Sequence, residues 1–190
     1  MNRLLIKNIN IINEGIKTSG DIYIEGEFIK KIGVDLTFDN EIKIIDGNGR
    51  IAIPGMIDDQ VHFREPGLTH KGDISSESKA AIAGGVTSYF EMPNTFPNTT
   101  SRKEFKKKIQ IASKNSFANF SFMFGGTNDN IDEIKKLDDK DVAGIKLFLG
   151  SSTGKMLIDN KDSIEKIFKS TSLPISAHCC LLYTSDAADE

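Results

Sequence analysis

Residues 57–67 read IDDQVHFREPG, and this stretch decides how the rest of the chain is interpreted. It begins as an apolar strand, in which the polar residues Gln60, His62 and Arg64 then alternate with their neighbours. Because successive side chains of a strand point to opposite faces, these three share one face, and Asp58 has the same parity. A polar face at the carboxyl end of a parallel strand is typical of barrel active sites. We therefore expect a functional site here.

Apolar, strand-like runs begin at residues 56, 87, 118, 142 and 174, so their starts are 31, 31, 24 and 32 residues apart. Helical patterns lie between them at residues 77–84, 102–114, 131–137 and 161–169, with the expected N-caps Ser76, Ser101, Asn130 and Asn160. This period predicts repeated βα units with parallel strands. It fits an open doubly wound sheet and the first half of an eight-stranded barrel equally well.

The two ends of the chain differ from this middle part. Residues 1–52 contain short strand-like runs and end in a strong turn signal, DGNG at residues 46–49, which predicts a small β domain. Residues 180–190, CLLYTSDAADE, lack the Ile, Lys and Asn of the body and read like a translated sequencing adapter. We therefore divide the chain into residues 1–52, residues 53–179 and a non-native tail at 180–190. The natural chain is then expected to continue past Cys179.

The composition excludes several classes of protein. With 24 Lys+Arg and 27 Asp+Glu the net charge is −3, and 38% of residues are hydrophobic, which argues against a basic nucleic-acid binder and against a disordered chain. No apolar run approaches the ~18–20 residues that span a bilayer. The adjacent Cys179 and Cys180 form no disulfide framework, and the first residues turn polar too early for a secretory signal. These features predict a cytoplasmic protein.

Two basic segments have simple interpretations. Residues 150–155, GSSTGK, hint at a phosphate loop, but three residues separate the glycines instead of four and Met156 follows the lysine. We interpret this segment as a substrate-side loop. The triplet Lys106-Lys107-Lys108 is interpreted as a solvated helix face.

Residues 57–67 resemble the first strand of the dihydroorotase branch of the amidohydrolase superfamily, which usually carries His-x-His-x-Arg-Glu-Pro-Gly. The resemblance extends over residues 1–179 and is closest to the Bacteroidetes-like type. Residues 91–95 (EMPNT), 144–149 (GIKLFL) and 176–179 (SAHC) are similar to the family's second, fourth and fifth strands. It implies an incomplete TIM (β/α)8 barrel of about five strands, preceded by part of a small β-sandwich domain.

The resemblance also implies a metal centre. His62, Lys146 and His178 would hold one or two Zn²⁺ ions, with Gln60 as a weak ligand, and CO₂ would carboxylate Lys146. Without the resemblance, Lys146 is simply an interior lysine paired with a carboxylate. Arg64 and Asn94 would bind a substrate carboxylate. His70 is interpreted as structural or supporting, and the general-base Asp is expected downstream, so no catalytic residue is assigned within this sequence.

The implied activity is interconversion of (S)-dihydroorotate and N-carbamoyl-L-aspartate in pyrimidine biosynthesis, by a homodimer when full length. Gln60 stands where the family has its first His, which leaves three interpretations: a weaker buried metal site, a one-metal enzyme, or a non-catalytic structural partner of aspartate carbamoyltransferase. Allantoinase and hydantoinase are further alternatives, although they lack Arg64 or its continuation. We expect the 190-residue fragment to be inactive and poorly soluble, because an incomplete barrel leaves an open sheet edge.

Overall fold

The computed structural model describes residues 3–38, 41–138, 140–150 and 156–179. The chain divides into two compact units, Met1–Gly55 and Met56–Glu190, and each is described by itself. The expected division at residue 52 stays a prediction. The loop at residues 151–155 and the tail at 180–190 lie outside the described residues. Among the described residues, no helix has the length and apolar character needed to cross a membrane.

The first unit is a five-stranded sheet in the order β3-β2-β1-β4, with β5 also paired to β1. Its strands are β1 (Arg3–Asn13), β2 (Ile16–Glu25), β3 (Phe28–Gly33), β4 (Lys43–Asp46) and β5 (Ile51–Ala52). The hairpin between β1 and β2 turns at Glu14 and Gly15, which both have positive φ as a tight hairpin turn requires. A small core forms around Leu5, Tyr23 and Leu36. The expectation of a small β domain is confirmed.

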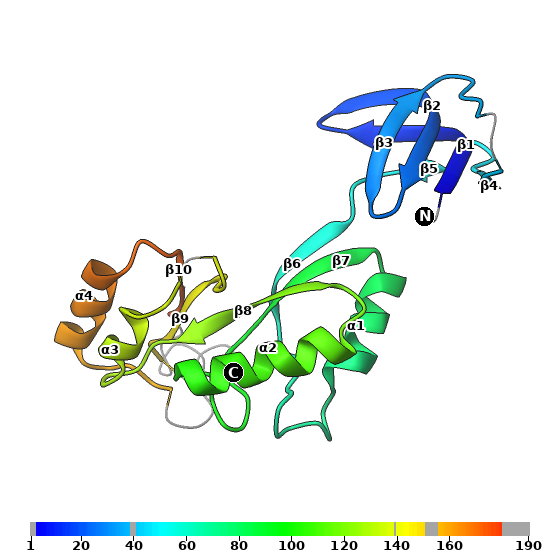
Figure 1. The fold of residues 1–190 in the computed structure, drawn as a ribbon. Helices are drawn as coiled ribbons and strands as arrows, with labels where there is room; N and C mark the ends of the chain where they lie inside the picture. Colours follow the sequence, from blue (N-terminus) through cyan, green and yellow to red (C-terminus); the bar gives the residue numbers. More distant parts are fainter. Residues whose placement is uncertain (1–2, 39–40, 139, 151–155, 180–190) are drawn as a thin grey trace, which may run out of the picture. The chain divides into compact units, whose positions relative to one another are not determined.

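The second unit is a parallel sheet in the sequential order β10-β9-β8-β7-β6. Its strands are β6 (Met56–Val61), β7 (Val86–Glu91), β8 (Asn119–Gly125), β9 (Gly144–Phe148) and β10 (Ile175–His178). A doubly wound sheet reverses its strand order at a switch point, whereas a barrel adds each strand beside the last one. Figure 1 shows this succession, with a helix after each of the first four strands. The order therefore favours the barrel over the open sheet.

The helices are α1 (Ile74–Ala83), α2 (Arg102–Asn115), α3 (Ile131–Ile134) and α4 (Lys161–Ser170). The expected cap of α1 is wrong: Asp73 caps the helix by accepting a bond from the N–H of Ser76, which lies three residues into it. The side chain of Ser76 in turn accepts the N–H of Asp73, which completes a capping box. Both residues are therefore typical N-cap residues in sequence, but only Asp73 occupies the cap position.

The other three caps lie where the sequence places them. The side chains of Ser101 and Asn160 accept bonds from the third residue of their helices. Asn130 occupies the cap position of α3, where its main-chain carbonyl accepts the N–H groups of Glu133 and Ile134 but its side chain makes no bond to the helix. Its side-chain amide donates to the carbonyls of Thr100 and Gly125, at 2.9 and 2.8 Å, so it ties the loop before α2 to the end of β8.

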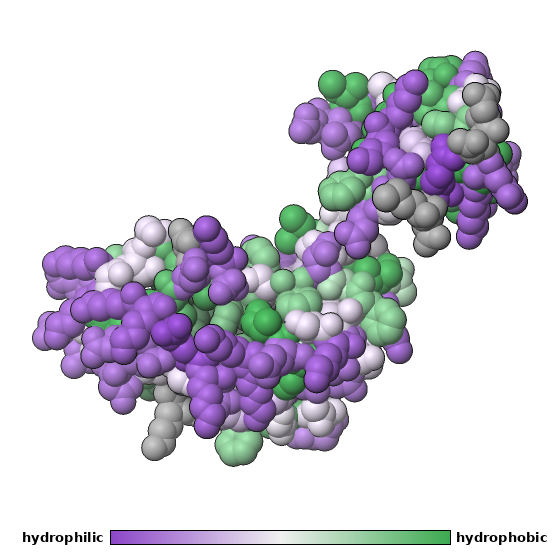
Figure 2. Space-filling model, in the orientation of Figure 1, coloured by the Kyte–Doolittle hydropathy of each residue, from purple (hydrophilic) through white to green (hydrophobic). Residues whose placement is uncertain are grey.

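The core of the second unit lies between the strands and the helices. Ile145 and Leu147 of β9 and Phe122 and Phe124 of β8 are buried there, as alternate residues of each strand. Met56 and Ile57 of β6, at one edge of the described sheet, are 59% and 62% exposed. In the view of Figure 2 this unit presents many hydrophilic residues with hydrophobic ones exposed among them. The predicted poor solubility of the fragment stays a prediction.

Candidate functional site

His62 and Asn94 meet at the carboxyl ends of β6 and β7. The Nδ1 atom of His62 lies 2.9 Å from Oδ1 of Asn94, although 32 residues separate them. Because the amide oxygen of Asn94 can only accept a hydrogen bond, Nδ1 carries the proton, and the lone pair of Nε2 stays free. Desolvation is the main cause that lowers the pKa of His62, the charge of Arg64 acts in the same direction, and the bond to Asn94 opposes it. The ring therefore presents a neutral nitrogen suited to a metal.

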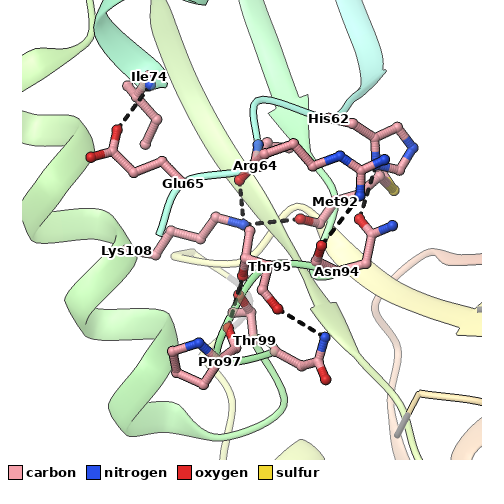
Figure 3. Close-up of polar contacts among 12 residues, drawn as sticks. His62, Arg64, Glu65, Ile74, Met92, Asn94, Thr95, Pro97, Thr99 and Lys108 are labelled. Atoms are coloured by element: carbon pink, nitrogen blue, oxygen red, sulfur yellow. Dashed lines mark hydrogen bonds and ion pairs between the residues drawn. The ribbon is translucent and has the colours of Figure 1, made fainter. Parts of the chain in front are cut away.

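Arg64 reaches the same place by a different route from the expected one. β6 ends at Val61, so the strand alternation does not extend to residue 64. Arg64 instead adopts a φ of 69°, in the left-handed region, and its Nη1 atom donates to the carbonyl oxygen of Asn94 at 3.4 Å. Figure 3 shows the guanidinium beside the side chains of His62 and Asn94. A local turn, and not strand parity, brings these three residues together.

Lys146 of β9 lies on the sheet face opposite to the core. Its side chain is buried, and among the described residues Nζ makes hydrogen bonds only to Oε1 of Gln60 and Oγ of Ser176, both long at 3.4 Å. None of the ion pairs among the described residues involves Lys146, so the simple interpretation of a lysine paired with a carboxylate is wrong there. Burial lowers the pKa of its amine, against smaller opposing effects of Cys179 and Asp59.

His178 ends β10, which pairs with β9 so that Ser176 faces Lys146 and His178 faces Phe148. His178 therefore lies on the same sheet face as Lys146, one strand repeat of roughly 6–7 Å further along. Its side chain is exposed, and its ring centroid is 6.2 Å from that of Phe148. His70 is also exposed, in the turn after β6.

These donors can be tested against a metal ion. Among the described residues, no three His, Cys, Asp or Glu side chains gather closely enough to bind one. The expected set instead depends on Lys146, a buried amine with no acidic partner in the part of the chain described. Conversion of this amine to a carbamate would add an anionic oxygen donor beside Gln60, and a divalent cation would compensate its negative charge. With Lys146 carboxylated, the residues present fit a divalent cation.

A buried ion pair lies beneath the site, and it corrects the interpretation of Lys108. Lys108 of α2 and Glu91 of β7 pair with side chains that are 0% and 1% exposed. Nζ of Lys108 also donates to the carbonyl oxygen of Met92 at 2.9 Å. Lys108 therefore does not belong to a solvated face. The sequence spacing already indicated this burial, because Lys108 lies between Phe105 and Ala112 on the buried stripe of the helix.

Burial acts on the two groups in opposite directions. It raises the pKa of Glu91 and lowers that of Lys108, while the attraction between the two charges opposes both shifts. One carboxylate oxygen of Glu91 also accepts the N–H of Arg64 at 3.1 Å. The pair thus contacts the main chain at a residue of the site.

Two further residues of the first motif connect the loops of the site. Oε2 of Glu65 accepts the N–H of Ile74, the first residue of α1, at 2.9 Å. Gly67 has a φ of 86°, and a Cβ atom there would lie 1.9 Å from the carbonyl oxygen of Phe96. Phe96 in turn donates its N–H to the carbonyl of Pro66 at 3.0 Å. The loop after β6 therefore packs directly on the loop after β7.

Comparison with known proteins identifies relatives of this chain. The family described as dihydro-orotase-like matches residues 49–136. A dihydroorotase of Methanosarcina mazei is 37% identical over 85% of this chain and 36% of its own length. The multifunctional protein CAD of Squalus acanthias is 33% identical over 80% of this chain and 7% of its own length.

Solved structures give the same picture of the fold. An L-hydantoinase (dihydropyrimidinase) from Arthrobacter aurescens superposes with a TM-score of 0.89 at 26% identity, over 98% of this chain and 43% of that one. A D-hydantoinase (dihydropyrimidinase) from Thermus sp. gives 0.78 at 27% identity, over 97% and 42%. The five parallel strands are thus the first part of a (β/α)8 barrel. The chain spans 36%, 34% and 40% of the length of the first three curated relatives.

Proposed function

We propose, starting from the relation of this chain to the dihydroorotases, that the full-length protein is a cyclic amide hydrolase that interconverts (S)-dihydroorotate and N-carbamoyl-L-aspartate. Dihydroorotases match this chain at 35–37% identity over most of its length. The proposal extends to a role in pyrimidine synthesis, to a homodimer and to a cytoplasmic location. It is supported by the relatives and by the chemistry of the residues that meet at the strand ends.

The observation that supports dihydroorotate as the substrate is the free hydrogen-bonding capacity of the Arg64 guanidinium. Its guanidinium makes one long bond, to Asn94, and takes part in none of the ion pairs of the described residues. Its remaining N–H groups are available to a planar carboxylate, which a guanidinium can bind in a bidentate manner. Dihydroorotate and N-carbamoyl-aspartate carry such a carboxylate, whereas allantoin and hydantoin rings do not. Arg64 therefore favours dihydroorotate over these alternatives.

The residues of this chain would divide the work as follows. His62, a carboxylated Lys146, His178 and the weaker Gln60 would hold Zn²⁺, which supplies a Lewis acid that activates water and polarises the amide carbonyl. Asn94 fixes the ring of His62 by its bond to Nδ1. Burial favours the neutral amine of Lys146, the form that reacts with CO₂. Arg64 and Asn94 orient the substrate through its carboxylate.

A second candidate function rests on Gln60. A glutamine carbonyl is a weaker zinc ligand than imidazole, and here its oxygen faces the Lys146 amine at 3.4 Å. A protein with this substitution could serve as a non-catalytic partner of aspartate carbamoyltransferase. The buried Lys146, which has no acidic partner among the described residues, favours catalysis, because a structural partner gains nothing from such an amine.

The experiment is to express the full-length protein with zinc, measure its metal content, and follow dihydroorotate formation from N-carbamoyl-aspartate. Lys146→Ala should abolish turnover and lower the bound metal, and Arg64→Met should raise KM. Lys107→Met, an exposed position of α2, is the control and should change neither. Stoichiometric metal without turnover would exclude the dihydroorotase. Co-purification with aspartate carbamoyltransferase in that case would favour the structural partner.

A further inference from the structure

We propose that the buried Glu91–Lys108 pair is a positioning device that holds Arg64 and Asn94 in the geometry that binds the substrate carboxylate. This inference rests on the proposed function, because it uses Arg64 and Asn94 as carboxylate ligands. Neither Glu91 nor Lys108 contacts the substrate in this account. Both act through the main chain.

The pair connects three elements. One oxygen of Glu91, at the end of β7, accepts the N–H of Arg64 at 3.1 Å, and the other pairs with Nζ of Lys108 from α2. Nζ of Lys108 also donates to the carbonyl oxygen of Met92 at 2.9 Å. Figure 3 shows Lys108 extending towards Met92, which lies two residues before Asn94. Both carboxylate-binding residues are therefore attached to the same buried pair, Arg64 through Glu91 and Asn94 through Met92.

Packing alone gives no reason for a charged pair at this position. The side chains are 0% and 1% exposed, and two apolar residues of similar size would fill the space without the cost of removing two charges from water. What an apolar pair cannot supply is an acceptor for the N–H of Arg64. That N–H belongs to a residue with a φ of 69°, in the left-handed region that residues other than glycine rarely adopt.

The hydrogen bond from Arg64 therefore has a specific effect. It stabilises the left-handed turn that directs the guanidinium away from the strand and towards Asn94. Loss of the bond would let residue 64 return to ordinary backbone angles and carry its side chain elsewhere. The expected consequence is weaker binding of the carboxylate, with the chemistry at the metal site unchanged.

Two double variants of the full-length protein separate this role from simple packing. Both Glu91→Met/Lys108→Met and Glu91→Gln/Lys108→Met replace the ion pair by a neutral pair of similar size. They differ in one respect, since the glutamine side chain of the second variant retains an oxygen that can accept the N–H of Arg64. Lys107→Met, on the exposed side of the same helix, is the matched control.

For the variant with two methionines we expect KM for N-carbamoyl-aspartate to rise about tenfold, the equivalent of one lost hydrogen bond of about 1.4 kcal/mol, with kcat little changed. The glutamine variant should raise KM only about threefold, and this remaining rise reflects the bond from Nζ of Lys108 to Met92 that both double variants lack. Equal KM values in the two double variants, or a parallel fall of kcat in both, would overturn the inference. If the double variants fail to fold, Glu91→Leu/Lys108→Leu and Glu91→Gln/Lys108→Leu make the same comparison without leaving an unpaired buried charge.

A second measurement does not depend on activity. Hydrogen exchange at the Arg64 amide should be about tenfold faster in the variant with methionine at position 91 than in the wild type and in the glutamine variant. If the wild-type protein turns over no dihydroorotate, the proposed function fails, and this exchange rate still decides whether Glu91 holds Arg64. Equal exchange rates in all three proteins would refute the positioning role.

Discussion

Replacing Glu65 by alanine removes a contact that the sequence motif does not reveal. Oε2 of Glu65 accepts the N–H of Ile74 at 2.9 Å, and Ile74 is completely buried. The first N–H groups of a helix have no partner within it, and the cap residue Asp73 accepts the bond of Ser76 instead. Alanine would therefore leave a buried N–H without an acceptor at the start of α1.

The size of the effect follows from this geometry. A hydrogen bond to a charged group contributes about 1.5–3 kcal/mol, and the partial exposure of Glu65 places the expected loss near the lower end, at about 2 kcal/mol. Two kcal/mol corresponds to about a 30-fold change in an equilibrium constant. Glu65→Gln keeps a neutral acceptor, so we expect it to lose about half as much free energy.

The assay is hydrogen exchange in the first turn of α1, measured on the full-length protein. Glu65→Ala should lower protection there by about 30-fold, with a smaller change for Glu65→Gln. Glu77→Ala is the matched control, since it removes an acidic side chain from the same helical turn without removing a main-chain contact. Equal protection in Glu65→Ala and Glu77→Ala would refute the reasoning.

Two more predictions concern the corrected helix cap and a buried tyrosine. Asp73→Ala should destabilise α1 more than Ser76→Ala does in urea unfolding. The N–H of Ser76 lowers the pKa of Asp73 in the folded state. The stabilisation by the Asp73 cap is therefore present above the unfolded-state pKa of Asp73 and is lost as pH falls through its folded-state pKa. Burial raises the pKa of Tyr89 to about 12, so its contribution to stability is present below the unfolded pKa of about 10 and lost as pH rises through about 12. An absorbance titration should show a late tyrosinate step that Tyr89→Phe lacks, and an unchanged titration would contradict this.

Strand and helix order could be predicted because the signals are local. The 24–32-residue period, the caps Ser101 and Asn160, and the alternation that places Lys146 opposite Ile145 and Leu147 can all be read within a few residues. The resemblance of residues 57–67 to one family added the barrel and the candidate ligands. The cap of α1 was wrong because Asp73 and Ser76 both fit the same local pattern.

The chain by itself determined the βα repeat, the small β domain before it and the types of side chain at the strand ends, since these depend on residues close together in sequence. Only the tertiary structure decided that Lys108 is buried against Glu91, that Glu65 bonds to α1, and that Arg64 turns towards Asn94. Each of these contacts joins residues 9 to 30 positions apart. Their partners are selected by the packing of whole elements, which no short stretch of sequence encodes.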